Sequence, residues 1–255
     1  MARNFNGTSD VIDIGTPAPL NISANSQIAV SVWMNPTAQP SSGSDADISG
    51  KGFDGTTTSY EMKISGSGAG NLIFFGSFSG GGHGAGSGGL ATTNGVWTHL
   101  YGDYDGATWH LYVNGILQGS STDAIGPQNN TMRSSIGALW LNGSFGNWFN
   151  GRVAHRCEWN QALTAPEVKQ LALGRSPLTI RPGRILGYWP LSMGYGQPAI
   201  DRGPFNLGSG TITGTKLAPD PPLTTISQIN LLDLEAPFPF VMVAPPALLM
   251  AQIVL

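Results

Sequence analysis

One loop of the chain combines the residue types that bind sugars. Residues 142–147 read Asn-Gly-Ser-Phe-Gly-Asn, and a tryptophan stands on either side of them. Exposed aromatic rings can stack on a pyranose, while amide groups can bond its hydroxyls. The candidate carbohydrate-binding residues are Trp140, Asn142, Asn147 and Trp148. The alternative is that these aromatic side chains belong to a core or an interface.

Two short acidic segments are the candidates for a metal site. Asp103-x-Asp105-Gly106 and Asp45-x-Asp47 offer carboxylate oxygens, the ligands that calcium takes. Neither comes with an ordered set of five or more oxygen ligands, and Asp105-Gly106 is also a strong hairpin-turn signal. We predict no metal and no cofactor, with calcium as the alternative at these positions.

The histidines do not form a metal-binding pattern. His99 and His110 lie on neighbouring predicted strands. We expect both to be half-buried polar side chains that pack beside Trp97 and Trp109.

Cys157 is the only cysteine, so the chain forms no intrachain disulfide. His155 lies two residues before it on one predicted strand, without a second pair of ligands elsewhere. We expect Cys157 to be a small core residue.

Composition limits the classes of partner. Charged residues are only 11% of the chain, the net charge is -3, and no cluster of Lys or Arg occurs, which argues against nucleic acid. The 36 glycines and 18 prolines, together with many aromatic and β-branched residues, are typical of short strands joined by tight turns. The first residues lack the apolar core of a signal peptide, so we expect folding in a cytosol.

Strand-like segments follow one another at short spacing. They are residues 28–34, 60–64, 72–75, 96–101, 108–113, 116–118, 132–141 and 151–159. Asp105-Gly106 and Asn114-Gly115 mark hairpin turns that join three of them, residues 96–101, 108–113 and 116–118. The Gly/Ser-rich residues 79–89, like residues 65–70, are expected to be long mobile loops.

One helix is predicted at residues 165–173. Thr164 and Glu167 have the spacing of a capping box, and Gly174 follows the last apolar residue. Val168 and Leu171 would then face the core.

Several short motifs occur in a characteristic order. They are Phe5-Asn-Gly-Thr-Ser-Asp10, Val30-Ser-Val-Trp-Met-Asn35, Trp97-Thr-His99, Tyr104-Asp-Gly106, Leu111-Tyr-Val-Asn-Gly115, Ile136-Gly137, Phe149-Asn-Gly151 and Leu163-Thr164. As a set they resemble the laminin-G-like, concanavalin A-like lectin/glucanase family over about residues 3–175. The resemblance implies an all-β, antiparallel jelly-roll sandwich with one short helix.

A later segment, Gly187-Tyr-Trp-Pro-Leu191, looks like the strand that usually opens such domains. We therefore predict that residues 185–191 pair with the N-terminal strand near residues 5–14, in a rearranged strand order. The predicted domains are the jelly roll over residues 1–215 and an extended, Pro-rich apolar C-terminal arm for assembly over residues 216–255.

The glucanase branch of this family cuts sugars with paired carboxylates in the form Glu-x-Asp-x-x-Glu, and no such run occurs here. Retaining hydrolysis needs two carboxyl groups about 5–5.5 Å apart. Asp103 and Asp105 lack a following glutamate, while Glu158 stands alone and Glu167 belongs to the helix cap. We predict no catalytic residues and no enzymatic activity.

The last forty residues are strongly apolar. After Lys216 only Asp220, Asp233 and Glu235 are charged, and residues 237–255 carry no charge. Prolines exclude a continuous helix here, which argues against a membrane span. Each large apolar side chain gains about 1.5–3 kcal/mol on burial, so we expect this arm to lie on a neighbouring subunit. The candidate assembly residues are Phe238, Phe240, Val241, Leu248, Leu249 and Ile253.

Two functions of different classes follow. The main hypothesis is a structural virion protein, a phage capsid or tail decoration (cement) protein whose lectin-like body is anchored by the C-terminal arm. Its partners would be other virion subunits in a trimer or higher homo-oligomer, assembled in the host cytoplasm. The link to phage proteins rests on a likeness of architecture, and the apolar arm, the low charge and the missing export signal favour it. The alternative is a carbohydrate-binding module or host-surface adhesin without catalysis, with glycans as partners.

Overall fold

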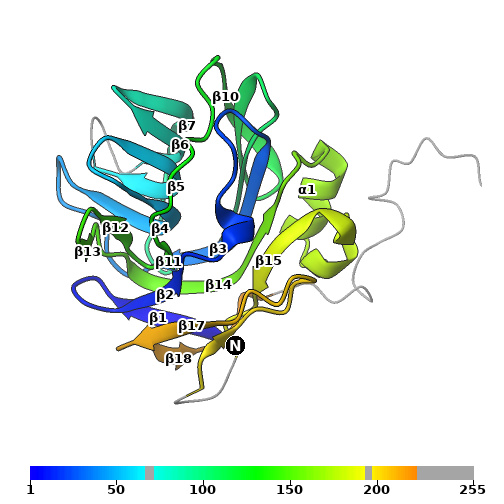
Figure 1. Ribbon diagram of the computed structural model, residues 1–255. Coiled ribbons are helices and arrows are strands. Elements are labelled where there is room, and N and C mark those ends of the chain that lie inside the picture. Colours follow the sequence, from blue (N-terminus) through cyan, green and yellow to red (C-terminus); the bar gives the residue numbers. More distant parts are fainter. Residues whose placement is uncertain (67–71, 193–196, 223–255) are drawn as a thin grey trace, which may run out of the picture. The chain divides into compact units, whose positions relative to one another are not determined.

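Strands with alternating inward and outward side chains form two antiparallel sheets that pack face to face (Figure 1). The computed structural model describes residues 1–66, 72–192 and 197–222. The predicted all-β jelly-roll sandwich with one short α-helix is confirmed.

The first sheet has eight strands. Its order is β10 (Ile116–Thr122), β9 (Thr108–Val113), β8 (Thr98–Tyr104), β3 (Ile28–Pro36), β14 (Asn150–Trp159), β1 (Ala2–Asn6) and β18 (Lys216–Ala218), with β15 (Ile185–Trp189) also paired to β14.

The second sheet has ten strands. Its order is β16 (Ala199–Ile200), β17 (Ser209–Thr213), β2 (Val11–Gly15), β11 (Ser134–Ile136), β4 (Asp45–Phe53), β5 (Thr57–Ser65), β6 (Leu72–Ser79) and β7 (Gly82–Ala91), and the hairpin of β12 (Leu139–Leu141) and β13 (Ser144–Gly146) joins it at β4. Three 3-10 turns, η1 (Ala18–Leu20), η2 (Pro177–Thr179) and η3 (Pro182–Arg184), lie in the connections.

The main core lies between the sheets. Val30, Val32 and Met34 of β3 point inward, and they pack with residues such as Met62 and Ile73 of the opposite sheet. The alternate residues of β3 point to the outer face of the first sheet. Because one face of each strand is buried, the pairing register is strongly specified.

The helix α1 (Ala165–Ala172) covers part of that outer face (Figure 1). The Thr164 N–H and hydroxyl both donate to Glu167 Oε2, at 2.7 and 2.8 Å, and Gly174 has φ +89° after the last turn. The predicted capping box and helix stop are therefore confirmed. Val168 and Leu171 are buried in a second cluster on the first sheet.

Residues 79–89 were expected to be a loop, and this is wrong, because residues 82–91 form β7 and pair with β6. A Cβ atom on Gly84 would lie 2.3 Å from the Phe75 carbonyl oxygen and 2.6 Å from the Phe74 ring. The glycine at position 84 therefore reflects a close approach of β7 to β6, since a side chain there would not fit.

The predicted pairing of residues 185–191 with the N-terminal strand is also wrong. β15 pairs with β14 at residues 156–159, while β1 pairs with β14 at residues 150–153. The ten residues of β14 offer an edge long enough for both strands, which follow each other along it. The N-terminal strands pair instead with later segments, β1 with β18 and β2 with β17.

The first sheet continues to Ala218, three residues past the predicted domain boundary, because β18 pairs with β1. The predicted arm residues from Phe238 to Ile253 lie outside the described residues. In the part of the chain that is described, no helix combines the length and apolar character of a membrane span.

A charged network lies inside the sandwich. Arg156 donates to Ser49 Oγ at 2.5 Å and Ser134 Oγ at 2.8 Å, and it pairs with Glu158; both charged side chains are fully buried. The Arg156 guanidinium also lies 4.7 Å from the centre of the Trp189 ring. Burial raises the pKa of Glu158, although the neighbouring guanidinium opposes this shift. These bonds connect β14 of the first sheet to β4 and β11 of the second.

Replacing Glu158 tests this network. Glu158→Gln leaves Arg156 buried without its counter-charge, so we expect the free energy of unfolding to fall by about 3–5 kcal/mol. Urea unfolding measures it. Glu167→Gln is the matched control, because glutamine also serves in a capping box. The free energy of unfolding of this variant should fall by no more than about 1 kcal/mol. Equal losses in both variants would contradict a structural role for the buried pair.

A second substitution tests the close contact at β7. Gly84→Ala places a methyl group against Phe75 and Phe74, so we expect a loss of about 1–3 kcal/mol. Gly82 lies in the same strand, and a Cβ atom there meets nothing within 4 Å. Gly82→Ala should change stability by less than about 1 kcal/mol. Chemical denaturation of both variants makes the comparison, and a Gly84→Ala protein as stable as the control would refute the explanation.

Candidate functional site

Three connections meet at a polar hollow of about 370 Å3, which we call the loop hollow. The connections follow β3, β1 and β13. The lining residues are Gly7, Ala38, Gln39, Pro40, Ser41, Ser44, Asp45, Ala46, Asn147, Trp148 and Asn150. Amide and hydroxyl groups therefore surround one half-buried indole ring.

Asn147 ties one wall of the loop hollow to β4. Its carbonyl accepts the Asp47 N–H at 2.8 Å, and its amide donates to Asp47 Oδ2 at 2.9 Å. Its φ of +53° is a left-handed conformation that asparagine tolerates better than most residues. These bonds hold the adjacent Trp148 at the hollow, next to an isolated bridge to Asp47.

A short aromatic row leads away from the loop hollow. The Phe145 ring centre lies 6.4 Å from that of Trp148 and 5.0 Å from that of Trp140. Arg133 lies over the Trp140 ring, 5.4 Å from its centre. The Trp140 ring thus packs among Arg133 and Phe145 rather than at the loop hollow.

The structure brings only part of the predicted sugar site together. Asn147 and Trp148 line the loop hollow, whereas Trp140 does not, and Asn142 lies in the exposed turn of the β12–β13 hairpin with φ +43°. Four further residues that line the loop hollow were not predicted from the sequence: Gln39, Ser41, Ser44 and Asn150. The Ser-Ser-Gly-Ser run at residues 41–44 was the available signal for the second loop.

Acidic groups beside the loop hollow are held by one lysine. Lys63 Nζ lies 2.8 Å from Asp45 Oδ2 and 2.6 Å from Glu61 Oε1. Burial raises the pKa of Glu61 and raises that of Asp47 well above its ordinary value. The described residues that line the loop hollow include Asp45 but neither Asp47 nor Glu61.

The carboxylates that were considered for calcium at Asp103-x-Asp105 have other partners. Asp103 Oδ1 lies 2.8 Å from His110 Nδ1, and Asp105 Oδ1 accepts the N–H groups of Ala107 and Thr108. Asp105-Gly106 thus forms the predicted hairpin turn. Across the residues that the structure covers, no group of three or more His, Cys, Asp or Glu is placed to hold a metal ion.

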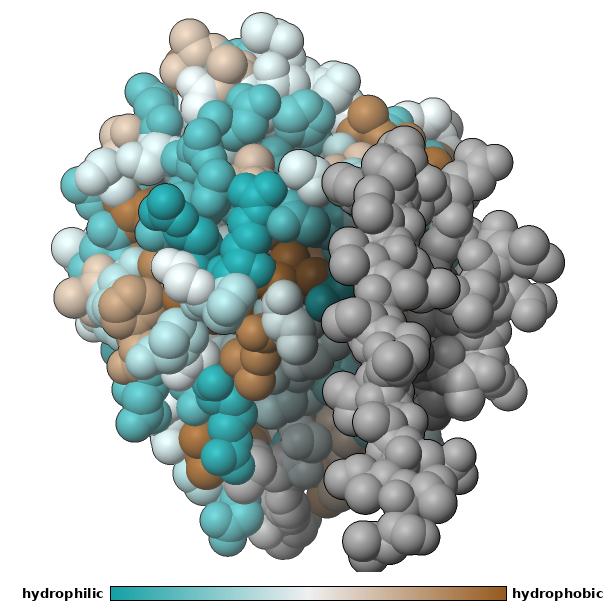
Figure 2. Space-filling view, turned by 90° about the vertical axis from the view of Figure 1, so that its right-hand side faces the viewer, coloured by the Kyte–Doolittle hydropathy of each residue, from teal (hydrophilic) through white to brown (hydrophobic). Residues whose placement is uncertain are grey.

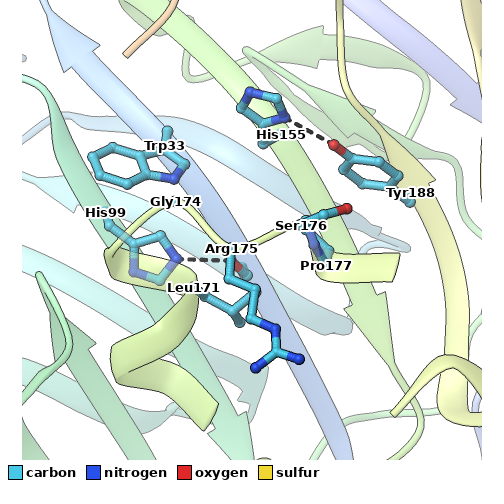
Figure 3. Close-up of a pocket in the computed structure, with 10 residues that line it drawn as sticks. Trp33, His99, His155, Leu171, Gly174, Arg175, Ser176, Pro177 and Tyr188 are labelled. Atoms are coloured by element: carbon cyan, nitrogen blue, oxygen red, sulfur yellow. Dashed lines mark hydrogen bonds between the residues drawn. The ribbon is translucent and has the colours of Figure 1, made fainter. Parts of the chain in front are cut away.

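A second hollow, of about 160 Å3, opens on the outer face of the first sheet beside α1 (Figure 3). We call it the sheet hollow. Its lining residues are Ser31, Trp33, His99, His155, Leu171, Gly174, Arg175, Ser176, Pro177 and Tyr188. It shares none of them with the loop hollow.

His99 is fully buried at the sheet hollow, and it packs against Trp33 rather than beside Trp97 as expected. The two ring centres are 5.2 Å apart, and His99 Nε2 bonds the Ser31 hydroxyl at 2.9 Å. Burial lowers the pKa of His99 to about 3. The imidazole is therefore neutral at physiological pH.

His155 and Tyr188 form a second polar pair in the sheet hollow (Figure 3). His155 Nδ1 lies 2.9 Å from the Tyr188 hydroxyl, and burial lowers the pKa of this histidine too. Cys157, on the same strand, is buried as expected, and burial raises the pKa of its thiol well above the ordinary value.

Two antiparallel sheets, one covering helix and polar loops at the sheet ends define a lectin-type jelly-roll sandwich. The family Laminin_G_3, described as the concanavalin A-like lectin/glucanases superfamily, matches residues 6–169. The chain belongs to this superfamily. No curated protein matches the chain.

Solved structures share the fold at low sequence identity. A protein from Bacteroides ovatus, provisionally named as carbohydrate binding, has a TM-score of 0.63 and 19% identity over 84% of this chain and 58% of its own. The chain thus spans less than two thirds of that relative. A heptameric SAP-like pentraxin from Limulus polyphemus has a TM-score of 0.53 and 16% identity, over 69% of this chain and 83% of its own. The CBM40 of a Ruminococcus gnavus IT-sialidase, bound to α2,3-sialyllactose, has a TM-score of 0.50 and 14% identity, over 67% and 95%.

The buried His99 predicts a pH dependence of stability. The unfolded chain binds a proton at His99 below its ordinary pKa of 6.5, whereas the folded protein does so only near pH 3. Stability therefore falls as the pH is lowered through this range, and at pH 5 the loss from this group is about 2 kcal/mol. In His99→Gln, the decrease in unfolding free energy from pH 7 to pH 5 should be smaller by that amount.

His110→Gln provides a control of opposite sign. The hydrogen bond to Asp103 raises the pKa of His110, so its contribution to stability is present at low pH and is lost as the pH rises. In His110→Gln, the decrease in the free energy of unfolding from pH 7 to pH 5 should therefore be larger than in wild type. Unfolding curves at both pH values measure these differences, and identical decreases in wild type and His99→Gln would contradict the buried neutral imidazole.

Proposed function

We propose that the protein binds carbohydrate in the loop hollow and does not hydrolyse it. The observation that carries this proposal is the position of Trp148 at a hollow whose other groups are mainly amides and hydroxyls. An aromatic face can stack on the C–H groups of a sugar ring, while Asn147, Asn150 and Ser44 can bond its hydroxyls.

Size and electrostatics agree with this ligand class. The volume of about 370 Å3 falls within the range of about 300–1,000 Å3 that is usual for small-molecule sites. Neutral amides and hydroxyls both donate and accept hydrogen bonds, as sugar hydroxyls do. Asp45 adds one acceptor at the edge of the hollow.

Binding without hydrolysis is favoured by the engagement of the nearby carboxyl groups. Lys63 bonds Asp45 and Glu61, and Asn147 bonds Asp47. Glycosidic cleavage needs one carboxyl group as acid and a second as nucleophile or base on the cleft floor. Here Asp45 is the single carboxyl group among the described residues that line the hollow.

The fold relatives support the same class. The Bacteroides ovatus protein is provisionally named for carbohydrate binding, and the Ruminococcus gnavus domain is bound to sialyllactose. Their identity to this chain is low, so they support the class of ligand and name no particular sugar. The virion and assembly roles stay a prediction, because they depend on residues 223–255, which lie outside the described residues.

A screen of immobilised glycans followed by calorimetry on the best ligand tests the proposal. We expect Trp148→Ala to weaken binding at least about tenfold, equivalent to about 1.4 kcal/mol. Trp140→Ala is the matched control, because that ring lies outside the loop hollow, and it should keep the wild-type Kd. Thermal unfolding confirms that both variants are folded.

Three results would overturn the proposal. The protein could bind no glycan in the screen, Trp148→Ala could bind as tightly as wild type, or incubation with the bound glycan could release new reducing ends. The last result would assign an enzymatic activity instead of binding.

A further inference from the structure

The sheet hollow contains polar groups that neither the core nor the proposed glycan site uses. His99 bonds Ser31 through Nε2, and His155 bonds Tyr188 through Nδ1. The second ring nitrogen of each histidine has no hydrogen-bond partner among the described residues. A buried polar atom without a partner costs about 1–3 kcal/mol, so a ligand that supplied partners would gain that energy.

The backbone is strained where it presents His155. The register between β14 and β3 shifts by one residue between Ala154 and Cys157, and His155, with φ +52°, is the extra residue. A left-handed conformation is costly for a residue other than glycine and is often found at binding sites. The bulge places this histidine on the outer face, next to Tyr188 (Figure 3).

An aromatic surface and one charge complete the sheet hollow. Trp33 is half-buried and packs on His99, so its ring is held in place. Arg175 lies exposed at the rim, where Nε donates to Thr179 Oγ1 at 2.9 Å and Nη1 donates to Gln170. These bonds hold the guanidinium before any ligand arrives, which lowers the entropy cost of binding an anion.

The charges of the hollow favour an anionic ligand. No Asp or Glu is among its described lining residues, and Arg175 is the one permanently charged group there. Burial lowers the pKa of both imidazoles and so favours their neutral form, although the Asp220 carboxylate, which is outside the lining, opposes this shift at His155. Arginine binds carboxylates through two parallel hydrogen bonds.

The volume limits the ligand to one small ring. The hollow measures about 160 Å3, less than half the volume of the loop hollow. On the side of the molecule that Figure 2 shows, hydrophobic residues are scattered singly among hydrophilic ones in the coloured part of the surface.

We propose that the sheet hollow is a second binding site, which takes one hexuronic acid residue of a glycan. Trp33 stacks on the sugar ring, the Ser31–His99 and Tyr188–His155 pairs bond its hydroxyls, and Arg175 binds its carboxylate. The site is independent of the loop hollow, because the two share no lining residue.

Titration of the full chain with methyl β-glucuronide and with methyl β-glucoside tests this site. The probes differ at C6, which bears a carboxylate in one and a hydroxymethyl group in the other. Chemical shifts of the 15N-labelled indole groups follow binding, with the Trp33 signal assigned from Trp33→Phe. We expect saturable binding of the glucuronide, at least about tenfold tighter than that of the glucoside, with a shift of the Trp33 signal.

Two substitutions distinguish the effect of the Arg175 guanidinium from the effect of the protein's net charge. Arg175→Gln should reduce the affinity for the glucuronide to that for the glucoside. Arg184→Gln removes the same charge from an exposed residue that does not line the hollow, and it should leave the affinity unchanged. Trp148→Ala should also leave it unchanged, which distinguishes this site from the loop hollow.

The proposal is overturned by any of four results. They are no saturable glucuronide binding, equal affinity for the two glycosides, an equal loss in Arg175→Gln and Arg184→Gln, or a loss of glucuronide binding in Trp148→Ala. The last result would place the glucuronide in the loop hollow, and it would leave the proposed carbohydrate binding there intact.

Discussion

The ion pair between Arg156 and Glu158 is the constraint on which the arrangement of the two sheets depends. Both side chains belong to β14 and lie fully buried between the sheets. Moving two charges out of water costs several kcal/mol per ion, and only well-placed partners offset that cost. The hydroxyls of Ser49 and Ser134 come from the opposite sheet, so the bonds that Arg156 makes to them form in one relative placement of the sheets. A one-residue slip of β14 would turn both charges to the outer face.

The bulge in β14 connects this interior network to the outer surface. The side chains of Val153 and Ala154 point to opposite faces of the sheet, as is usual in a strand. One extra residue then precedes Arg156. Arg156 and Glu158 can therefore face the core while Cys157 still pairs with Ser31 of β3. His155 is that extra residue, and its side chain lies on the outer face. The hydrogen bonds that Arg156 makes inside the sandwich therefore offset the cost of the left-handed backbone at His155. The packing of the core thus places His155 at the sheet hollow, where it forms the polar pair with Tyr188.

The two hollows use different parts of the scaffold. The loop hollow is made by connections that the sheets hold in place, as is common for binding sites. The sheet hollow lies on the strands themselves, with α1 and the chain after it as one wall. If both sites engage one glycan, the second contact becomes intramolecular, and the overall affinity exceeds that of either site alone.

Features that depend on local interactions follow from the sequence alone. The capping box of Thr164 and Glu167 and the hairpin turns at Asp105-Gly106 and Asn114-Gly115 rest on residues close in the chain, and the structure has each of them. Features that depend on distant partners follow from the tertiary structure. Residues 82–91 form a strand because their backbone pairs with β6, although their composition resembles that of a loop, and at Gly84 the two strands lie so close that a side chain would not fit. Trp148 lines a hollow and Trp140 does not, although both flank the same loop, because Arg133 and Phe145 pack against Trp140. Local patterns encode turns, caps and faces, whereas the choice of a strand's neighbour or a ring's exposure is made by residues far away in the chain.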